Sequence, residues 1–204
     1  MATISIIGAG NMGTAIAGLA LAAGNDVQVV ARDRAKAAAV DAAVTATTFG
    51  EPLVGDVVVL ALPYPALDDV VATYGAQLDG RTVVDITNPL DFATFDSLVV
   101  PADSSAAAGL AAALPGATVL KAFNTTFAAT LASGTVGDVP TTVLVAGDDA
   151  DAKAAFAAAF DGSAVRVVDA GALKRARELE ALGFLQLTLA AGDKTQWTTG
   201  FALL

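Results

Sequence analysis

Three glycines spaced as G-x-G-x-x-G are the residues of this chain best suited to chemistry, namely the binding of a pyrophosphate. Gly8, Gly10 and Gly13 lie between an apolar run over residues 2–7 and a small-residue run over 14–23. Between a strand and a helix, the first glycine permits a tight turn, the second admits the pyrophosphate, and the third allows close helix packing. Unpaired N–H groups at the helix start favour negative charge. We therefore expect a dinucleotide site, with an ordinary glycine-containing turn as the alternative.

The residues that follow the second expected strand indicate which dinucleotide binds. Ala31, small and neutral, stands where an acidic side chain would bond a ribose 2′-hydroxyl, and Arg32 and Lys36 follow it. An arginine at this place accommodates a 2′-phosphate, so we expect NADP rather than NAD. Asp33 has a spacing that also suits a ribose-binding acid, but we expect it to lie in the turn and cap the next helix. Solvated loop charges are the alternative interpretation.

Three loops that follow expected strands carry amides beside rigid or aromatic groups. Their residues are Leu62, Pro63 and Tyr64 in the first loop, Asn88 and Pro89 in the second, and Asn124 and Phe127 in the third. Ligands of an open parallel sheet bind outside the carboxyl ends of its strands, so we expect these loops to form one site. Asn88 and Asn124 would position and polarise a ligand, and the other residues would form walls. Each loop alone is also an ordinary strand-ending turn.

Composition narrows the chemistry further. The 204 residues include no cysteine and no histidine, which excludes thiolate catalysis, disulfides and Cys-ligated metals, and we expect no metal site. A net charge of -10 argues against nucleic acid. No apolar run approaches the roughly 20 residues that cross a bilayer, and no basic leader precedes the first strand. We expect a soluble, cytoplasmic protein without a nucleic-acid or membrane partner.

Alternating strand and helix patterns must position these residues, which predicts an α/β fold with a doubly wound, mostly parallel sheet. The expected strands cover residues 2–7, 26–31, 56–62, 82–86, 118–123, 141–146 and 164–168. The expected helices cover 14–23, 34–40, about 66–77, 104–114, 149–160 and 172–191. We divide the chain into a dinucleotide-binding domain, 1–136, and a small C-terminal α/β lobe, 137–204, packed on it without a linker.

Four motifs together resemble the NADPH-dependent reductases of the deazaflavin coenzyme F420, many bacterial members of which are known only as predicted dinucleotide-binding enzymes. The motifs are Gly8-Ala9-Gly10-Asn11-Met12-Gly13, Val84-Asp85-Ile86-Thr87-Asn88-Pro89-Leu90, Lys121-Ala122-Phe123-Asn124-Thr125 and Leu173-Lys174-Arg175-Ala176-Arg177-Glu178-Leu179-Glu180. The resemblance extends over nearly the whole chain, including the Gly200-Phe201 tail.

This resemblance implies a Rossmann-type fold with NADPH on the glycine loop, including Ala9, Asn11 and Met12. It also implies that Arg32 and Lys36 hold the 2′-phosphate, and that a hydride passes to a flavin-like ring, F420 or a flavin, in a cleft. The chain departs from the pattern of the archaeal family members at three positions. It has Ala9 and Ala31 where those proteins have hydroxyl residues, and Asn124 where they have a histidine. The segment between Val40 and Asp56 is also shorter.

Two other functions remain open. A pyrroline-5-carboxylate reductase has a similar N-terminal motif but needs a long helical dimerisation domain. A non-catalytic NADP-sensing module would bind the dinucleotide without turnover.

One expected helix carries a cluster of charged residues, where we expect a solvated face or a dimer contact. They are Arg175, Arg177, Glu178 and Glu180. The partner we expect is a small-molecule redox co-substrate, and a homodimer stays open.

Overall fold

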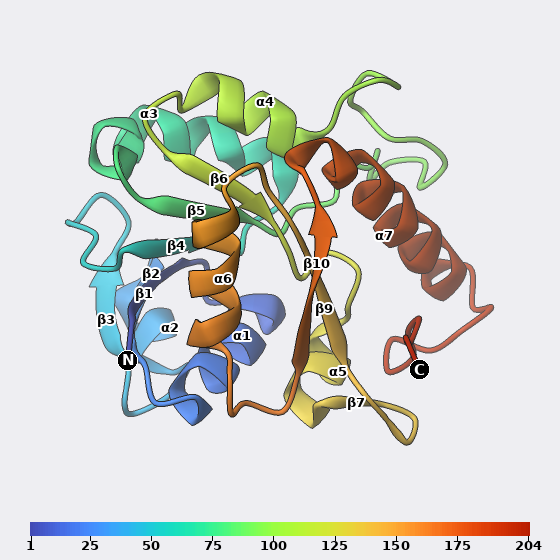
Figure 1. Ribbon diagram of the computed structural model, residues 1–204, viewed down its shortest axis with the longest axis horizontal. Coiled ribbons are helices and arrows are strands. Elements are labelled where there is room, and N and C mark those ends of the chain that lie inside the picture. Colours follow the sequence, from blue (N-terminus) through green and yellow to red (C-terminus); the bar gives the residue numbers. More distant parts are fainter.

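The fold is built on one eight-stranded sheet, shown by a computed structural model that describes residues 1–204 (Figure 1). Its strands are β1 Thr3–Ile7, β2 Asp26–Ala31, β3 Thr45–Thr48, β4 Val57–Leu60, β5 Thr82–Asp85, β6 Thr118–Lys121, β9 Thr142–Ala146 and β10 Arg166–Gly171. The strand order is β10-β9-β6-β5-β4-β1-β2-β3, and every neighbouring pair is parallel except β6 with β9. A separate hairpin pairs β7 Thr135–Val136 with β8 Val139–Pro140. The expected mostly parallel α/β sheet is confirmed.

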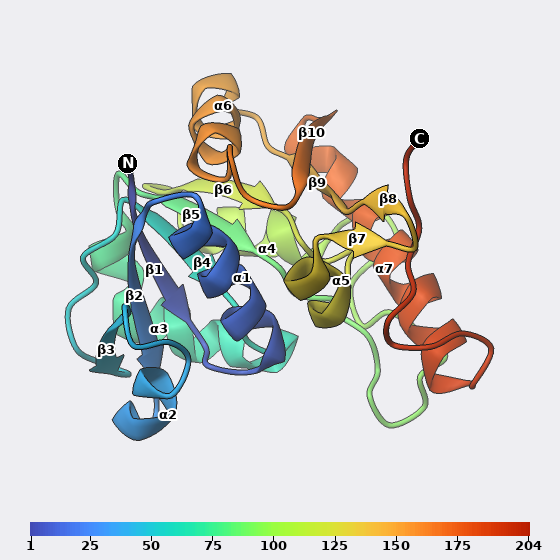
Figure 2. The ribbon, with the colours of Figure 1, turned by 90° about the horizontal axis from the view of Figure 1, so that it is seen from below.

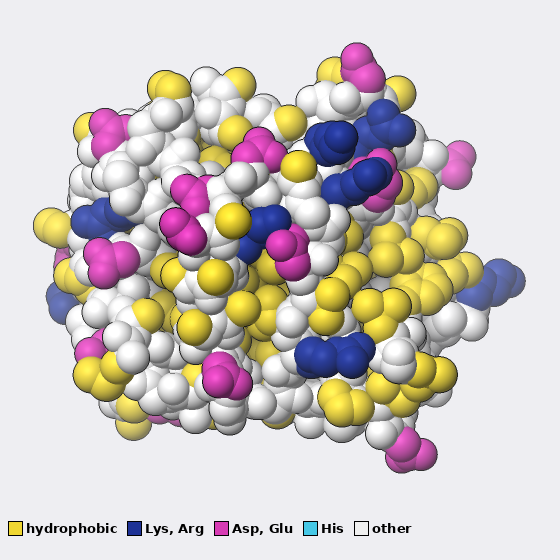
Figure 3. All heavy atoms as spheres, in the orientation of Figure 1, with side chains coloured by type: hydrophobic (Ala, Val, Ile, Leu, Met, Phe, Trp, Pro, Cys, Tyr) yellow, Lys and Arg dark blue, Asp and Glu magenta, His cyan; other side chains and the backbone are white.

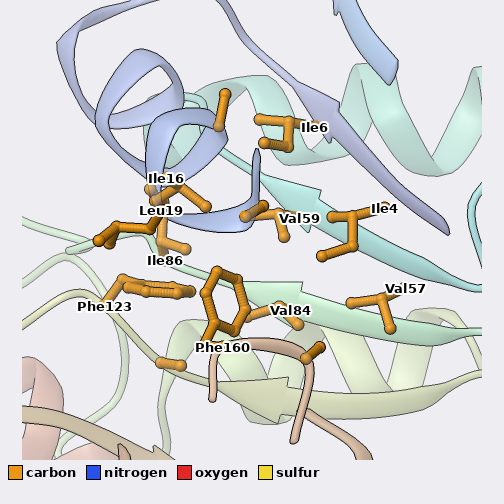
Figure 4. Packing of buried hydrophobic residues seen from close by; sticks show 14 of the residues in the cluster. Ile4, Ile6, Ile16, Leu19, Val57, Val59, Val84, Ile86, Phe123 and Phe160 are labelled. Atoms are coloured by element: carbon orange, nitrogen blue, oxygen red, sulfur yellow. The ribbon is translucent and has the colours of Figure 1, made fainter. Parts of the chain in front are cut away.

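Helices cover both faces of this sheet. They are α1 Asn11–Ala22, α2 Arg34–Ala38, α3 Leu67–Leu78, α4 Ala106–Ala113, α5 Ala128–Ser133, α6 Ala150–Ala159 and α7 Ala176–Ala191, with one-turn 3₁₀ helices at Tyr64–Ala66 and Leu173–Arg175. Successive strand side chains point to opposite faces. Ile4 and Ile6 therefore join a buried cluster with Ile16 of α1 and Phe160 next to α6 (Figure 4), whereas Ile7 packs with residues of α3 and α4 on the other face.

The C-terminal residues extend the same sheet and then run back along it. β9 joins β6 through an antiparallel pair between Lys121 and Ala146, and β10 forms the sheet edge. The domain boundary expected at residues 136 and 137 stays a prediction. After α7 the chain turns back toward the hairpin β7–β8 (Figure 2), and hydrophobic side chains gather on the surface over α7 and this tail (Figure 3). The longest helix, α7, has 16 residues, and no helix combines the length and apolar character that a bilayer crossing demands.

Three elements were not expected from the sequence. β3 is a short, polar run of threonine and alanine, α5 has only six residues, and the hairpin β7–β8 has two residues in each strand. None of these segments is long enough to show the periodic spacing of apolar residues that distinguishes a helix or strand from a loop. β3 forms because it pairs in register with the edge of β2 over Gln28–Ala31, a contact that no local pattern contains.

Candidate active site

The three glycines of the glycine loop differ in what surrounds their Cα atoms. Gly8 has φ 123°, and a Cβ there would lie 2.1 Å from the carbonyl oxygen of Ala61, at the end of β4. A Cβ on Gly13 would lie 2.0 Å from the Gly8 carbonyl oxygen. A Cβ on Gly10 would meet no atom within 4 Å. Gly8 and Gly13 are therefore required by the fold, whereas at Gly10 only an external group would need the space.

The start of α1 has the properties of an anion site. Its N-cap is Gly10, no side chain caps it, and no acidic residue lies in its first turn. The first intrahelical bond runs from the Thr14 N–H to the Gly10 carbonyl at 2.9 Å, which leaves the N–H groups of residues 11–13 without intrahelical acceptors. The helix dipole adds partial positive charge at the same point. The open space above Gly10 therefore suits a pyrophosphate.

A first cavity of about 450 Å³ lies on one side of the glycine loop. Its lining includes Gly8, Ala9 and Gly10, then Ala31, Arg32 and Lys36 after β2, and Leu62 and Pro63 after β4. Arg32 and Lys36 form no salt bridge, whereas the intervening Arg34 lies 3.9 Å from Glu51 and does not line the cavity. Two cations thus remain available for an anionic ligand at the end of β2.

Asp33 lies in the same cavity wall but is committed to the backbone. Its Oδ1 accepts a hydrogen bond of 2.9 Å from the Ala35 N–H, so Asp33 is the N-cap of α2. The expectation that it lies in the turn and caps the helix is confirmed. Asp69, in the first turn of α3, is a second carboxylate on this cavity that the sequence did not suggest.

A second cavity of about 370 Å³ lies on the other side of the α1 start. Asn11 and Met12 of α1 line it together with Asn88, Asn124, Phe127 and Trp197. The first turn of α1 therefore separates two cavities, one with cations and one with amides and aromatic rings. An elongated ligand bound across this turn would place one end in each cavity.

Asn88 and Asn124 form a pair of amides in the second cavity. The Asn124 Nδ2 donates to Asn88 Oδ1 at 2.9 Å and to the Leu179 carbonyl at 2.8 Å, and Asn88 Nδ2 donates to the Asn124 carbonyl at 2.9 Å. Because both partners of Asn124 Nδ2 are acceptors, these bonds fix the orientation of its amide. The buried Asn124 Oδ1 has no hydrogen-bond donor in the protein. The pair therefore has a fixed geometry and one unsatisfied acceptor.

Helix α7 packs directly on this amide pair. A Cβ at Gly183 would lie 2.4 Å from Asn88 Oδ1 and 2.7 Å from the Asn124 carbonyl oxygen. The glycine is thus what allows the helix to approach so closely. One turn earlier, the Leu179 carbonyl accepts the Asn124 amide bond. The role of Gly183 was not predictable from the sequence, because an isolated glycine inside an expected helix carries no distinctive signal.

A buried ion triad lies at the ends of β5 and β6. The Lys121 Nζ donates to Asp85 Oδ2 at 2.8 Å and to the Thr87 carbonyl at 2.5 Å, and it lies 2.8 Å from Glu180 Oε1. All three charged side chains are essentially inaccessible to solvent. Burial of three charges costs several kcal/mol for each ion unless partners compensate, and here every carboxylate has them. The triad ties β5, β6 and α7 together immediately before Asn88 and Asn124.

Glu180 also completes the start of α4. Its Oε2 accepts from the Ala106 N–H at 2.9 Å and its Oε1 from the Ala107 N–H at 3.3 Å, beside the N-cap Ser105. Burial raises the pKa of the Glu180 carboxyl above its ordinary value of 4.5, against the opposing effects of Lys121 and the Ala106 N–H. The expectation of a solvated face is therefore wrong for Glu180. It holds for Arg175 and Glu178, which form an exposed pair at 3.2 Å.

Three of the residues expected in the site, Gly13, Tyr64 and Pro89, lie outside both cavities. Tyr64 lines a separate depression between α3 and α4, and Pro89 is buried without facing either cavity. Gly13 acts through packing, as described above. The functional roles of all these residues stay predictions. Trp197 was missed, because it belongs to an irregular tail whose sequence indicates no partner.

Comparisons with known proteins identify the family to which the chain belongs. The model of the family described as "NADP oxidoreductase coenzyme F420-dependent" matches residues 3–89. The F420-dependent NADP reductase of Methanocaldococcus jannaschii is 33% identical over 150 residues, which are 71% of this chain and 66% of that protein. A solved structure of a proposed F420-dependent NADP-reductase from Arthrobacter sp. FB24 superposes with a TM-score of 0.85 at 26% identity, covering 100% of both chains. The chain belongs to the F420-dependent NADP oxidoreductase family.

This family membership agrees with the site's position. The matched residues 3–89 include the glycine loop, the cations after β2 and Asn88. The metalloreductase STEAP3 of Rattus norvegicus is 29% identical over 184 residues, which are 88% of this chain but 36% of that protein. The chain thus spans about two thirds of the first curated relative and about one third of the second. The fold and the comparisons therefore agree that the chain is a Rossmann-type, dinucleotide-binding oxidoreductase of the F420-dependent family.

Proposed function

We propose that this protein transfers a hydride between NADPH and a flavin-like acceptor, the deazaflavin F420 or a flavin. The observation that carries the proposal is the pair of cavities on either side of the α1 N-terminus. NADPH supplies the hydride from its nicotinamide ring when bound.

The chain has the residues that an NADP-type cofactor needs. The empty space above Gly10 and the unpaired N–H groups at the start of α1 suit its pyrophosphate. Arg32 and Lys36, without carboxylate partners, suit the 2′-phosphate. Leu62 and Pro63 provide the apolar wall of the same cavity. These features support NADP over NAD, since the nearest acid after β2, Asp33, already caps α2.

The second cavity offers positioning rather than acid–base chemistry. Its polar lining consists of amides and hydroxyls, with Asn88 and Asn124 locked to each other and to α7. Hydride transfer between aligned rings requires close approach, roughly 3–3.5 Å between reacting atoms, and fixed dipoles toward the developing charge. Lys121 cannot serve as a proton donor at the cavity, because it is buried in the triad and does not line it. These properties support a hydride-transfer site.

A non-catalytic NADP sensor is the competing function, and turnover separates the two. Purified protein is mixed anaerobically with NADPH and either F420 or FMN, and absorbance at 340 nm is followed. The proposal predicts protein-dependent loss of NADPH with at least one acceptor. A sensor would bind NADPH in calorimetry and consume none with either. Arg34→Ala, which changes a cation outside both cavities, serves as the matched control and should retain the activity.

A further inference from the structure

The tail after α7 brings an aromatic side chain to the second cavity. Asp193, with φ 56°, reverses the chain, and the Lys194 N–H donates to the Leu189 carbonyl at 2.9 Å. A second turn is closed by the Thr199 N–H and the Gln196 carbonyl at 3.1 Å, with Trp197 at its first central position. Trp197 is therefore presented at the tip of a hydrogen-bonded turn.

The tail also makes contacts after this turn. Gly200 lies beside Val136 of β7, where a Cβ on Gly200 would be in ordinary van der Waals contact with the valine side chain, at 3.4 Å. Arg166 Nη2, at the start of β10, donates to the Leu203 carbonyl at 2.9 Å. The backbone on either side of Trp197 is thus held by contacts with α7, β7 and β10.

Trp197 contacts Phe127 and leaves much of its surface uncovered at the cavity. The two ring centroids are 5.1 Å apart with an interplanar angle of 51°, and both rings line the second cavity. Trp197 still exposes 51% of its surface. A tryptophan that is held by turns and half exposed beside a cavity offers a flat face to a ligand.

We propose that Trp197, supported by Phe127, is the wall on which the acceptor's planar ring stacks, and that it selects conjugated tricyclic acceptors of the flavin and deazaflavin class. This inference rests on the proposed function and specifies its acceptor site. Aromatic side chains stack on any flat heterocycle with useful affinity, whereas a small aliphatic carbonyl substrate gains little from such a face. Loss of the indole should therefore weaken acceptor binding and leave NADPH binding on the other side of α1 unchanged.

Trp197 is the only tryptophan in the chain, so its fluorescence reports on this one wall. Titration of the wild-type protein with FMN and, separately, F420 should quench the emission saturably, after inner-filter correction with N-acetyltryptophanamide. The two titrations distinguish a flavin from a deazaflavin ligand. The absence of saturable quenching with both compounds would overturn the proposal, whether or not NADPH is oxidised in the turnover assay.

Kinetics test the same wall independently. At saturating NADPH, Trp197→Leu should raise the acceptor KM about tenfold. The NADPH Kd from calorimetry should stay within twofold of wild type, and Trp197→Phe should restore most of the loss. Phe201→Leu, in the same tail but outside the cavity lining, is the matched control and should behave as wild type. An unchanged acceptor KM in Trp197→Leu, or an equal loss of NADPH affinity, would refute the assignment. Failure of wild-type turnover itself would instead refute the proposed function.

Discussion

Three alanine substitutions along α1 separate the glycines required by the fold from the one that we assign to the ligand. Gly10→Ala introduces a Cβ that meets no protein atom within 4 Å, at φ -85° and ψ -175°, a conformation alanine adopts readily. Its effect on the free energy of unfolding should be no more than about 1 kcal/mol. The methyl group would occupy the space assigned to the pyrophosphate. Loss of one hydrogen bond to a charged group costs about 1.5–3 kcal/mol, which weakens the NADPH Kd about ten- to hundredfold.

The other two substitutions give the contrast. Gly13→Ala should gain about 1 kcal/mol of helix propensity. It also places a Cβ 2.0 Å from the Gly8 carbonyl oxygen, so we expect a net loss of about 2 kcal/mol or more in unfolding free energy. Gly18→Ala meets no atom within 4 Å on the same helix and should stabilise the protein by up to about 1 kcal/mol without affecting NADPH. Denaturant unfolding and calorimetry measure the two quantities. Wild-type NADPH affinity in a folded Gly10→Ala protein would refute the loop assignment.

Three further predictions concern charges. Arg32→Ala should weaken NADPH binding at least tenfold while NADH binding stays within twofold, and equal losses in calorimetry would remove Arg32 from the 2′-phosphate site. Lys121→Met leaves two buried carboxylates without their cation and should lower the unfolding free energy by about 3–5 kcal/mol, so a change below 1 kcal/mol in denaturant unfolding would contradict the triad. Because the pKa of Glu180 is raised in the folded state, this carboxyl is more protonated in the native protein than in the unfolded chain between pH 4.5 and the raised pKa. The contribution of Glu180 to stability should therefore fall as pH rises from 4.5 through that raised pKa. The difference in stability between wild type and Glu180→Gln should change over this pH range, and parallel pH profiles would show that the pKa is not raised.

Much of the fold was predictable because local patterns agree with it. β2 begins and ends at the residues expected, since a valine-rich run is bounded by Asn25 and by the charged turn after Ala31. The glycine loop was also predictable, because its three glycines follow a strand and precede a helix, and the fold itself excludes a Cβ at Gly8 and Gly13. Helix α4 begins at Ala106, two residues later than expected, since Ser105 is its N-cap and accepts the capping bond from the Ala108 N–H.

The parts that sequence reasoning missed depend on contacts between distant segments. Glu180 appears on a helix with charged neighbours, and only the fold shows that its partner is Lys121 at the end of β6. The need for glycine at position 183 comes from its contact with Asn88 and Asn124, in the loops after β5 and β6. The place of Trp197 at the cavity becomes evident only from its contact with Phe127. In each case the local sequence is compatible with an exposed residue. The pairing that determines its role is long-range and leaves no periodic signal.

Transfer of deuterium from NADPH labelled at its reactive C4 position tests the central claim most directly. The labelled dinucleotide is incubated anaerobically with the protein and oxidised F420 or FMN, and the reduced acceptor is analysed by mass spectrometry or NMR. The account predicts deuterium in reduced F420 in proportion to the NADPH consumed; FMN takes hydride at a nitrogen that exchanges with water, so there the expected sign is a slower rate with the label. Binding of NADPH with neither label transfer nor an isotope effect for either acceptor would contradict it.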